Sequence, residues 1–166
     1  MDLIKGDITT LDLDCIVNAA NEDLMPGGGV CGAIHQAAGK ELALECKKIG
    51  HCGVGEARIT SGYDLKAKHV IHTVGPIWHG GKDGEDQYLF NCYKKSLLLS
   101  THHGIESIAF PNISTGIYGY PKELAAETAI AAVKQHQRSG RQLKEVIFCC
   151  FDEENFQLYD KLLKKD

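Results

Sequence analysis

The sequence lacks any segment that resembles a membrane anchor or a secretory leader. No apolar run approaches the roughly 20 residues that span a bilayer, and the first residues have neither a basic nor an apolar region. Linkers, low-complexity tracts and internal repeats are also missing. We therefore expect a soluble protein that does not partner with membranes.

Cysteine pairs with redox or metal-ligand spacing are missing too. The seven cysteines are scattered, with no C-x-x-C pair, and several fall in apolar runs where a thiol packs as a small hydrophobic group. The histidines, and the pair Cys46 and Cys52, lack the spacing of metal ligands. We expect reduced thiols, no metal and no cofactor, and a cytoplasmic location, or a nuclear one in a eukaryote.

An excess of positive charge is absent as well. The formal net charge is −4, and the lysine pairs at 47–48, 94–95 and 164–165 are spread along the chain. Nonspecific nucleic-acid binding depends on clustered Lys and Arg that neutralise phosphates. Nucleic acid is therefore an unlikely partner.

What is present is an alternation of apolar strands and helical patterns. The chain has 166 residues, 43% of them hydrophobic, and a chain of this size buries about 70% of its unfolded surface, so we expect one domain over residues 1–166. Apolar strands separated by helices predict an α/β fold, a three-layer α/β/α sandwich. Strands are predicted at residues 15–17, 57–60, 69–74, 107–110 and 145–150, and helices at 30–46, 86–103, 121–137 and 154–164.

A glycine loop after the first predicted strand is the strongest sign of a binding site. The glycines at 27–29 let the backbone approach a ligand, and the helix from Val30 onward offers free N–H groups at the positive end of its dipole. Asn18 and Asn21 precede the loop, and their amides suit sugar hydroxyls next to a phosphate. The pattern favours a site for a phosphorylated sugar over a plain turn.

Residues 27–32 also fit the pattern G-x-G-x-x-G, so a dinucleotide-binding Rossmann unit is a competing interpretation. That unit needs an acidic residue about 20 positions further on, at the end of the next strand. Residues 49–55 read Ile-Gly-His-Cys-Gly-Val-Gly, without a carboxylate. The redox interpretation is therefore the weaker one.

Other loops that leave predicted strands carry suitable chemistry, and ligands bind at such places in open α/β sheets. The loop 111–121 combines hydroxyls, glycines and N–H groups, and predicts a second phosphate cradle. Phe151 follows the last strand and could stack on a base, and Asp7 could accept from an adenine amino group. Each feature also has an ordinary explanation as a turn, a core residue or a cap. Together they fit an ADP-sugar better than a simpler ligand.

These residues resemble the macrodomain family, and within it the MacroD type. The motifs that carry the resemblance are Gly-Asp-Ile-Thr at 6–9, Val-Asn-Ala-Ala-Asn at 17–21, Gly-Gly-Gly-Val at 27–30, Gly-Ala-Ile-His at 32–35, Val-Ile-His-Thr-Val-Gly-Pro at 70–76 and Ile-Ser-Thr-Gly-Ile-Tyr-Gly at 113–119. They extend over nearly all of the chain. The resemblance implies a mixed central sheet between helices and a cleft for ADP-ribose.

The resemblance also implies roles for individual residues. Asp7 and Ile8 would take the adenine, with Phe151 packed against it, and the two glycine loops would take the diphosphate. Asn21, with Asn18 and Tyr118 nearby, would orient the distal ribose. The ligand-binding residues expected are Asp7, Ile8, Asn18, Gly28, Gly29, Val30, Ser114, Thr115, Gly116, Ile117, Tyr118 and Phe151, and the catalytic residues expected are Asn21, Cys31 and Tyr118.

The activity implied is hydrolysis. Members of the MacroD type remove single ADP-ribose units from acidic side chains of proteins and deacetylate O-acetyl-ADP-ribose, so we expect these partners and a monomeric enzyme. This chain departs from the type at Cys31, where an Asp is usual, and at Pro26, where a glycine is usual. We therefore expect a substrate phosphate oxygen to activate water, while Cys31 shapes the pocket. The alternative is a reader that binds ADP-ribosylated proteins without cleaving them.

A Cys–His nucleophile is a further alternative. His35 lies four residues after Cys31, on the same face of the predicted helix. The sequence shows no third member of such a group, and a histidine hydrogen-bonded for structure is commoner. We therefore favour a structural role for His35.

Overall fold

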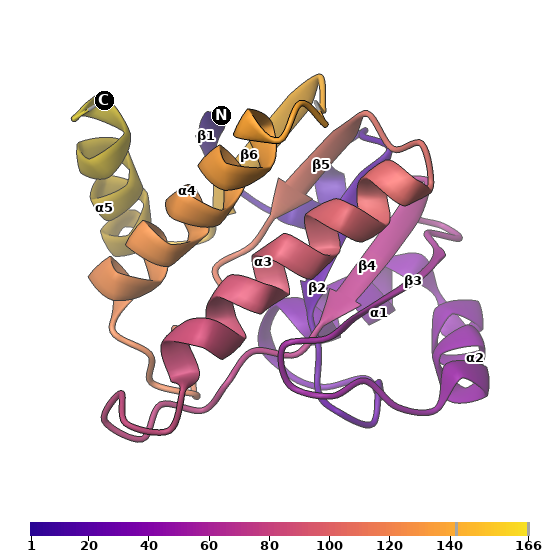
Figure 1. Ribbon diagram of the computed structural model, residues 1–166. Coiled ribbons are helices and arrows are strands. Elements are labelled where there is room, and N and C mark those ends of the chain that lie inside the picture. The colour runs from indigo at the N-terminus through magenta and orange to yellow at the C-terminus, as the bar shows by residue number, and fades with distance from the viewer. Residues whose placement is uncertain (142, 166) are drawn as a thin grey trace.

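The computed structural model describes residues 1–141 and 143–165, and they form a six-stranded sheet flanked by helices (Figure 1). The strands are β1 (Asp2–Lys5), β2 (Cys15–Ala19), β3 (Ala57–Ser61), β4 (His69–Thr73), β5 (Ser107–Phe110) and β6 (Glu145–Cys150). The helices are the short 3-10 helix η1 (Ile8–Thr10), α1 (Gly29–Ala38), α2 (Lys40–Ile49), α3 (Glu85–His102), α4 (Lys122–Arg138) and α5 (Glu153–Lys164).

The strand order is β1-β6-β5-β2-β4-β3, and the sheet is mixed because of one edge. Every neighbouring pair is parallel except β3 and β4, which run antiparallel with Ile59 opposite Ile71. Right-handed helical crossovers suit the parallel pairs, whereas a short connection suffices for the antiparallel one. The mixed α/β sandwich expected from the sequence is confirmed.

Helices cover both faces of this sheet. In Figure 1, α3 and α4 lie side by side across one face with α5 next to α4, and α1 and α2 lie behind the sheet. Side chains alternate between the faces: Val17 of β2 packs in the core beneath α3 and α4, and Ile16 packs in the core beneath α1 and α2. No helix in the described ranges is long and apolar enough to cross a membrane.

One predicted helix is in fact two. The sequence predicted a single helix over residues 30–46, but α1 ends at Ala38 and α2 begins at Lys40. Gly39 lies between them with φ +88° and ψ 172°, a conformation that is essentially restricted to glycine. Its N–H donates to the carbonyl of His35, 3.1 Å away, and closes α1. The prediction of a continuous helix was wrong because the apolar spacing continues across this turn.

The other predicted elements differ from the observed ones mainly at their ends. Strand β2 continues for two residues beyond Val17, so that Asn18 lies within the strand. Pro121 precedes α4 as its N-cap residue instead of occupying its first turn. The edge strand β1 was not predicted as a strand, and it pairs in parallel with β6.

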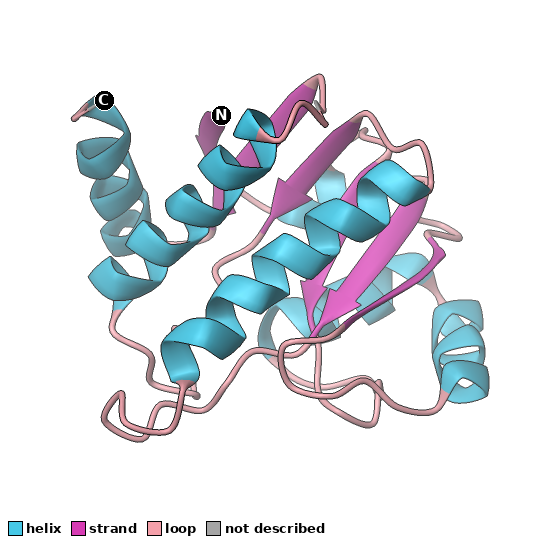
Figure 2. Cartoon of the chain, viewed as in Figure 1, coloured by secondary structure: helices cyan, strands magenta, loops and turns pink. Residues whose placement is uncertain are grey.

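The parallel strands end at one edge of the sheet, where loops gather in Figure 2. Because parallel strands share a direction, the residues that follow each strand meet at this edge. The loop-borne residues predicted from the sequence are thereby brought together.

Candidate ADP-ribose cleft

A cleft of about 680 Å³ lies at this edge, and all five parallel strands contribute to it. Its volume is in the usual range for small-molecule sites. Of the residues predicted from the sequence, those that line it are Asp7, Ile8, Asn21, Gly28, Gly29, Val30, Cys31, Ser114, Thr115, Gly116, Ile117, Tyr118 and Phe151. Asn18 alone among the predicted residues does not line it.

One end of the cleft combines a carboxylate with an exposed aromatic ring. Asp7 caps η1: its Oδ1 accepts from the N–H of Thr9 at 2.9 Å and from the Thr9 hydroxyl at 2.7 Å. Such a cap fixes the carboxylate and leaves its second oxygen for another donor. Phe151 follows β6, and with 81% of its surface exposed its ring offers a stacking face. This end suits a flat heterocycle that carries an amino group.

The first glycine loop presents the uncapped N-terminus of α1. Gly28 is the N-cap residue, and no side chain caps the helix there. The first N–H groups of a helix have no partner within it, and they carry the positive end of its dipole. The start of α1 is therefore suited to a phosphate.

Asn21 is held at the rim of this loop by two hydrogen bonds to one residue. Its Nδ2 donates to the carbonyl of Met25 at 2.8 Å, and its Oδ1 accepts from the N–H of Met25 at 3.0 Å. The paired bonds fix the orientation of the amide. The second hydrogen on Nδ2 and the second lone pair on Oδ1 are left for a ligand.

Ser114, in the second glycine loop, has a strained backbone and a hydroxyl without a hydrogen-bond partner among the described residues. Ser114 has φ +67°, a region unfavourable for residues other than glycine, and its Oγ is buried without a partner. The backbone of Gly75 packs so closely that a Cβ there would overlap Ser114 Oγ. Ile117, at the tip of this loop, is fully exposed. The hydroxyl is thus placed in the cleft wall at a cost to stability.

A neighbouring loop supports this second glycine loop. The N–H of Trp78 donates to the carbonyl of Tyr118 at 2.8 Å, and the ring of Trp78 lies 4.7 Å from that of Tyr120. Glu85 organises the loop beyond Trp78, since its carboxylate accepts three N–H bonds, from residues 79, 81 and 83. The bond from His79 is the largest of the effects that lower the pKa of Glu85, to about 2.

Cys31 is buried against polar groups, and Asn18 lies behind it. The Cys31 thiol is 3.7 Å from Asn18 Nδ2 and 3.6 Å from the Met25 carbonyl. Asn18 is fully buried in β2, with Nδ2 3.1 Å from Nδ1 of His72. The interpretation of Asn18 as a residue at a strand end that faces the sugar is therefore corrected: it reaches the cleft only through Cys31.

The Cys–His pair is not formed. Within the described chain, His35 Nδ1 is buried without a hydrogen-bond partner, and no bond joins it to Cys31. Burial lowers the pKa of His35, which keeps its ring neutral at pH 7. The hydrogen bond expected of a structural histidine is also missing at Nδ1 in the described chain, so His35 acts in the structure as a packed, buried ring.

Two asparagines in the cleft wall were missed by the sequence interpretation. Asn155 is 3% exposed, its Nδ2 donates to Asp152 at 2.9 Å, and its Oδ1 is buried without a partner. Asn112 lies shortly after β5, and its Nδ2 is 3.5 Å from the Cys150 thiol. The position of Asn112 just after a strand was a usable signal, whereas nothing in the sequence showed that Asn155 would turn inward from α5.

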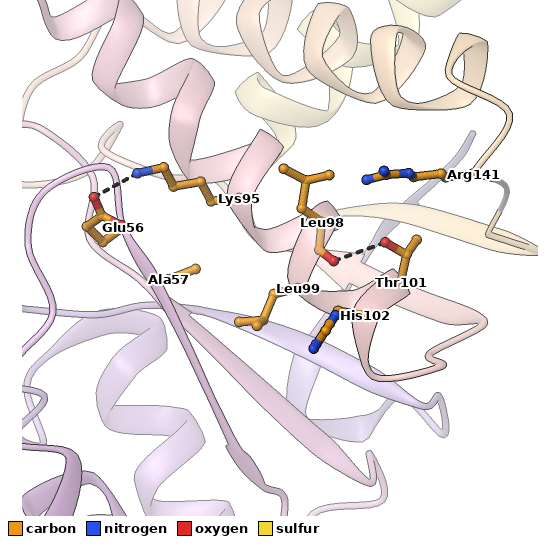
Figure 3. A pocket seen from close by; sticks show the side chains of 8 residues that line it. All are labelled: Glu56, Ala57, Lys95, Leu98, Leu99, Thr101, His102 and Arg141. Carbon is orange, nitrogen blue, oxygen red and sulfur yellow. Dashed lines mark hydrogen bonds and ion pairs between the residues drawn. The ribbon is translucent and has the colours of Figure 1, made fainter.

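A second hollow lies against α3 and the start of β3 (Figure 3). Several of its polar groups already have partners: Lys95 forms an ion pair with Glu56 at 2.7 Å, and the Thr101 hydroxyl donates to the carbonyl of Leu98 at 3.0 Å. None of the residues predicted to bind or react lines it. The cleft at the strand ends is the better candidate site, because it holds buried polar atoms that lack partners. No cluster of three metal-binding side chains occurs in the described part of the chain.

Comparison with known proteins identifies the family. The family model described as "Macro domain" matches residues 17–129. An O-acetyl-ADP-ribose deacetylase of Cronobacter turicensis is 54% identical over 167 residues, with 98% of this chain and 95% of that protein covered. The structure of an Oceanobacillus iheyensis macrodomain with ADP has a TM-score of 0.94 at 40% identity, covering 98% of this chain and 89% of that one. A Trypanosoma brucei macrodomain in complex with ADP-ribose has a TM-score of 0.90 at 40% identity, covering 97% and 68%. The chain therefore belongs to the Macro domain family.

Proposed function

We propose that this protein binds ADP-ribose in the cleft and hydrolyses esters of its distal ribose. The substrates proposed are O-acetyl-ADP-ribose and proteins that carry a single ADP-ribose on an acidic side chain. A relative that shares 54% of its residues is named for the deacetylase activity, and neighbouring structures hold ADP or ADP-ribose. We also propose that the protein acts in the cytoplasm as a monomer, without metal or cofactor.

The observation that carries the proposal is the order of groups along the cleft. Asp7 and Phe151 follow β1 and β6 at one edge of the sheet, the loop of Ser114 follows the neighbouring strand β5, and the start of α1 comes after β2, the next strand along. Asn21 follows β2, and the carbonyl of Tyr118 accepts from the N–H of Trp78, which follows β4, the strand beyond β2. An ADP-ribose laid along this order meets a carboxylate at its amino group, N–H and hydroxyl donors at its diphosphate, and amide and phenol groups at its second ribose.

The reaction proposed is ester hydrolysis by a positioned water. The water oxygen forms a bond to the acyl carbon, the bond from that carbon to the ribose oxygen breaks, and the proton from water passes to the departing ribose oxygen, which leaves as a hydroxyl. Asn21 and Tyr118 hold the ribose so that the ester faces the water, and a phosphate oxygen of the substrate takes the proton first.

Cys31 has no place as the base in this scheme. The residue is 5% exposed, and its sulfur lies between the amide of Asn18 and the carbonyl of Met25, so its proton is directed at the Met25 oxygen. The thiol thus fills the position between α1 and the loop that carries Asn21. This arrangement supports a role in the shape of the pocket.

The test measures release of free ADP-ribose from a protein ADP-ribosylated on glutamate, and release of acetate from O-acetyl-ADP-ribose. Wild type, Asn21→Ala and Cys31→Asp are compared, with Asn91→Ala on α3 as a control that removes an asparagine outside the cleft. Turnover by wild type that falls at least tenfold in Asn21→Ala and stays unchanged in Asn91→Ala supports the hydrolase. ADP-ribose binding without wild-type turnover, and turnover gained in Cys31→Asp, would instead support the non-catalytic reader.

A further inference from the structure

A chain of buried hydrogen bonds runs beneath the cleft, from β3 to the rim. It begins at Thr60, whose hydroxyl lies 2.9 Å from Nε2 of His72 and 3.1 Å from the carbonyl of Ser61. It continues from Nδ1 of His72 to Nδ2 of Asn18 at 3.1 Å, and from there to the Cys31 thiol at 3.7 Å. His72 and Asn18 are fully buried, so no water competes for these bonds.

The donors along this chain point outward from Asn18, toward Thr60 on one side and toward Met25 on the other. The Thr60 hydroxyl donates to the Ser61 carbonyl and accepts from the Nε2–H of His72, which leaves Nδ1 of that ring as an acceptor. Nδ1 then accepts from Asn18, so the amide of Asn18 turns its nitrogen to both His72 and Cys31. Burial lowers the pKa of His72 to about 3, and the ring therefore stays neutral at every pH at which the protein would work.

The chain of hydrogen bonds ends at the Met25 carbonyl, which also fixes the side chain of Asn21. The Cys31 thiol accepts from Asn18 and donates to the Met25 carbonyl, 3.6 Å away. The same carbonyl accepts from Asn21 Nδ2 at 2.8 Å. The orientation of a residue in β4 is thereby linked through two side chains to the amide at the rim of the cleft.

We propose that His72 is a positioning residue for hydrolysis: held by Thr60, it orients Asn18, which directs the Cys31 thiol to the Met25 carbonyl and so places the Asn21 amide. This inference rests on the proposed function and assigns the part of the reaction that depends on residues outside the cleft. Neither His72 nor Thr60 lines the cleft, so their effect on substrate passes through the members of the chain that do, Cys31 and Asn21.

Removal of the first bond should reverse the direction of the donors. In Thr60→Val the shape of the side chain is kept, but Nε2–H loses its acceptor. The proton then moves to Nδ1, the Asn18 amide rotates so that Oδ1 accepts it, and the thiol turns from the Met25 carbonyl to Asn18 Oδ1. Asn18 Oδ1 is buried without a partner in the wild type, so it is free to accept these protons.

Kinetic measurements distinguish a positioning role of His72 from a purely structural one. We expect kcat to fall about fivefold in Thr60→Val, the scale of one lost hydrogen bond, while KM and the Kd for ADP-ribose change by less than twofold. Thr60→Ser keeps the hydroxyl and should restore wild-type kcat, although it lacks a buried methyl group and should be the less stable variant. Loss of kcat in proportion to loss of stability would overturn the proposal.

A double-mutant cycle tests whether the effect travels through Cys31. Cys31→Ala should lower kcat about fivefold, and the double variant with Thr60→Val should be no slower than either single one, because both break the same chain. Multiplied effects would overturn the proposal. Cys46→Ala is the matched control: its thiol also lies near His72 Nε2, at 3.8 Å, but off the path to Asn21, so kcat should not change.

Nitrogen NMR tests whether His72 controls the orientation of the Asn21 amide, without any need for turnover. In wild type the His72 ring should be the Nε2–H tautomer, and in Thr60→Val the Nδ1–H tautomer, with a shift of the Asn21 side-chain amide that Thr60→Ser does not cause. A tautomer change with an unmoved Asn21 signal refutes the link even if the wild type is a reader with no turnover. Conversely, absence of turnover with these shifts present counts against the proposed hydrolase and leaves the link standing.

Discussion

At the scale of single residues, the cleft contains polar atoms that the folded chain does not satisfy. Ser114 Oγ and Asn155 Oδ1 are buried without partners, and a buried polar group without a hydrogen bond costs about 1–3 kcal/mol. In a site for a phosphorylated sugar, such atoms are placed for the ligand at the expense of the free protein. Removal of one of these unpartnered atoms should therefore raise the stability of the free protein and lower its affinity for the ligand.

Ser114→Ala tests this opposition. We expect the free energy of unfolding to rise by about 0.5–1 kcal/mol, and ADP-ribose binding to weaken about five- to tenfold, because one hydroxyl donor is lost. Urea denaturation and titration calorimetry measure the two quantities. Ser96→Ala is the control, since Ser96 Oγ is also buried without a partner but lies in α3 outside the cleft, so stability alone should rise. Equal affinity of Ser114→Ala and wild type would show that this hydroxyl does not meet the ligand.

At the scale of elements, the N-terminal turn of α3 holds the loop that supports Tyr118. The pKa of Glu85 is lowered to about 2 from an ordinary value of 4.5, so the carboxylate is charged more readily in the folded state than in the unfolded one. Its contribution to stability is therefore present above about pH 4.5 and is lost as the pH falls toward 2.

The single tryptophan reports on this loop, because Trp78 lies against Gly81 and its ring contacts the tilted ring of Tyr120. We expect Trp78 fluorescence in wild type to change between about pH 4.5 and pH 2. Glu85→Gln should remove that transition and already show a loosened loop at pH 7. Asp86→Asn removes a charge from the same turn and should keep the transition. A transition that persists in Glu85→Gln would assign it to another group.

The turn at Gly39 separates α1, which carries the cleft, from α2. An alanine there would adopt a strained backbone, and its Cβ would lie 3.0 Å from Asp64 Oδ2. We expect Gly39→Ala to lower the free energy of unfolding by about 2–3 kcal/mol, measured by urea denaturation. Gly104→Ala has φ +69° with open space around the new Cβ, and should cost only about 1 kcal/mol. Equal losses in both variants would show that contact with Asp64 is unimportant.

The same elements show how far sequence patterns predict this structure. Strands such as β5 and β6 were predicted at their observed bounds, because they are short apolar runs between turn residues. The break at Gly39 was not predicted, because a hydrophobic pattern records burial and not backbone conformation. Asn18 was placed at the end of the strand because β2 was predicted two residues short, and the added residues place it on the same face as Ile16, toward α1.

The site residues that could be predicted from the sequence are those that follow the parallel strands directly. Residues just beyond parallel strands meet at one edge, so Asp7, Asn21, Ser114 and Phe151 could be grouped from the order of strands and loops alone. Asn155 could not, because its inward orientation depends on how α5 packs. The link from Thr60 through His72 was equally hidden, since it joins residues of different strands.

At the scale of the whole molecule, all seven cysteines are free and buried. Burial raises the pKa of most of these thiols, to about 11 for Cys46, Cys52, Cys92, Cys149 and Cys150. A rise from 9.0 to about 11 lowers the thiolate fraction at neutral pH about 100-fold, and the thiolate is the reactive form.

Thiol labelling should therefore follow global unfolding. With a maleimide or a disulfide reagent at pH 7, we expect little labelling of the native protein and seven modified residues in denaturant, counted by mass spectrometry. Cys31, which lines the cleft, should be the first to react, and saturating ADP-ribose should slow its reaction. Cys31→Ala identifies that signal by its loss. Rapid labelling of several native thiols would show that the core opens locally.

Both chain ends lie away from the cleft. Strand β1 runs toward the cleft from Met1, and α5 begins beside the cleft at Glu153 and leads away from it, so Met1 and the C-terminal end of α5 are at the opposite edge of the sheet (Figure 1). An affinity tag, a fluorescent protein or a solid support attached at either end would leave the cleft open to solution. An immobilised Asn21→Ala variant that still binds would then serve as a capture reagent for peptides bearing ADP-ribose.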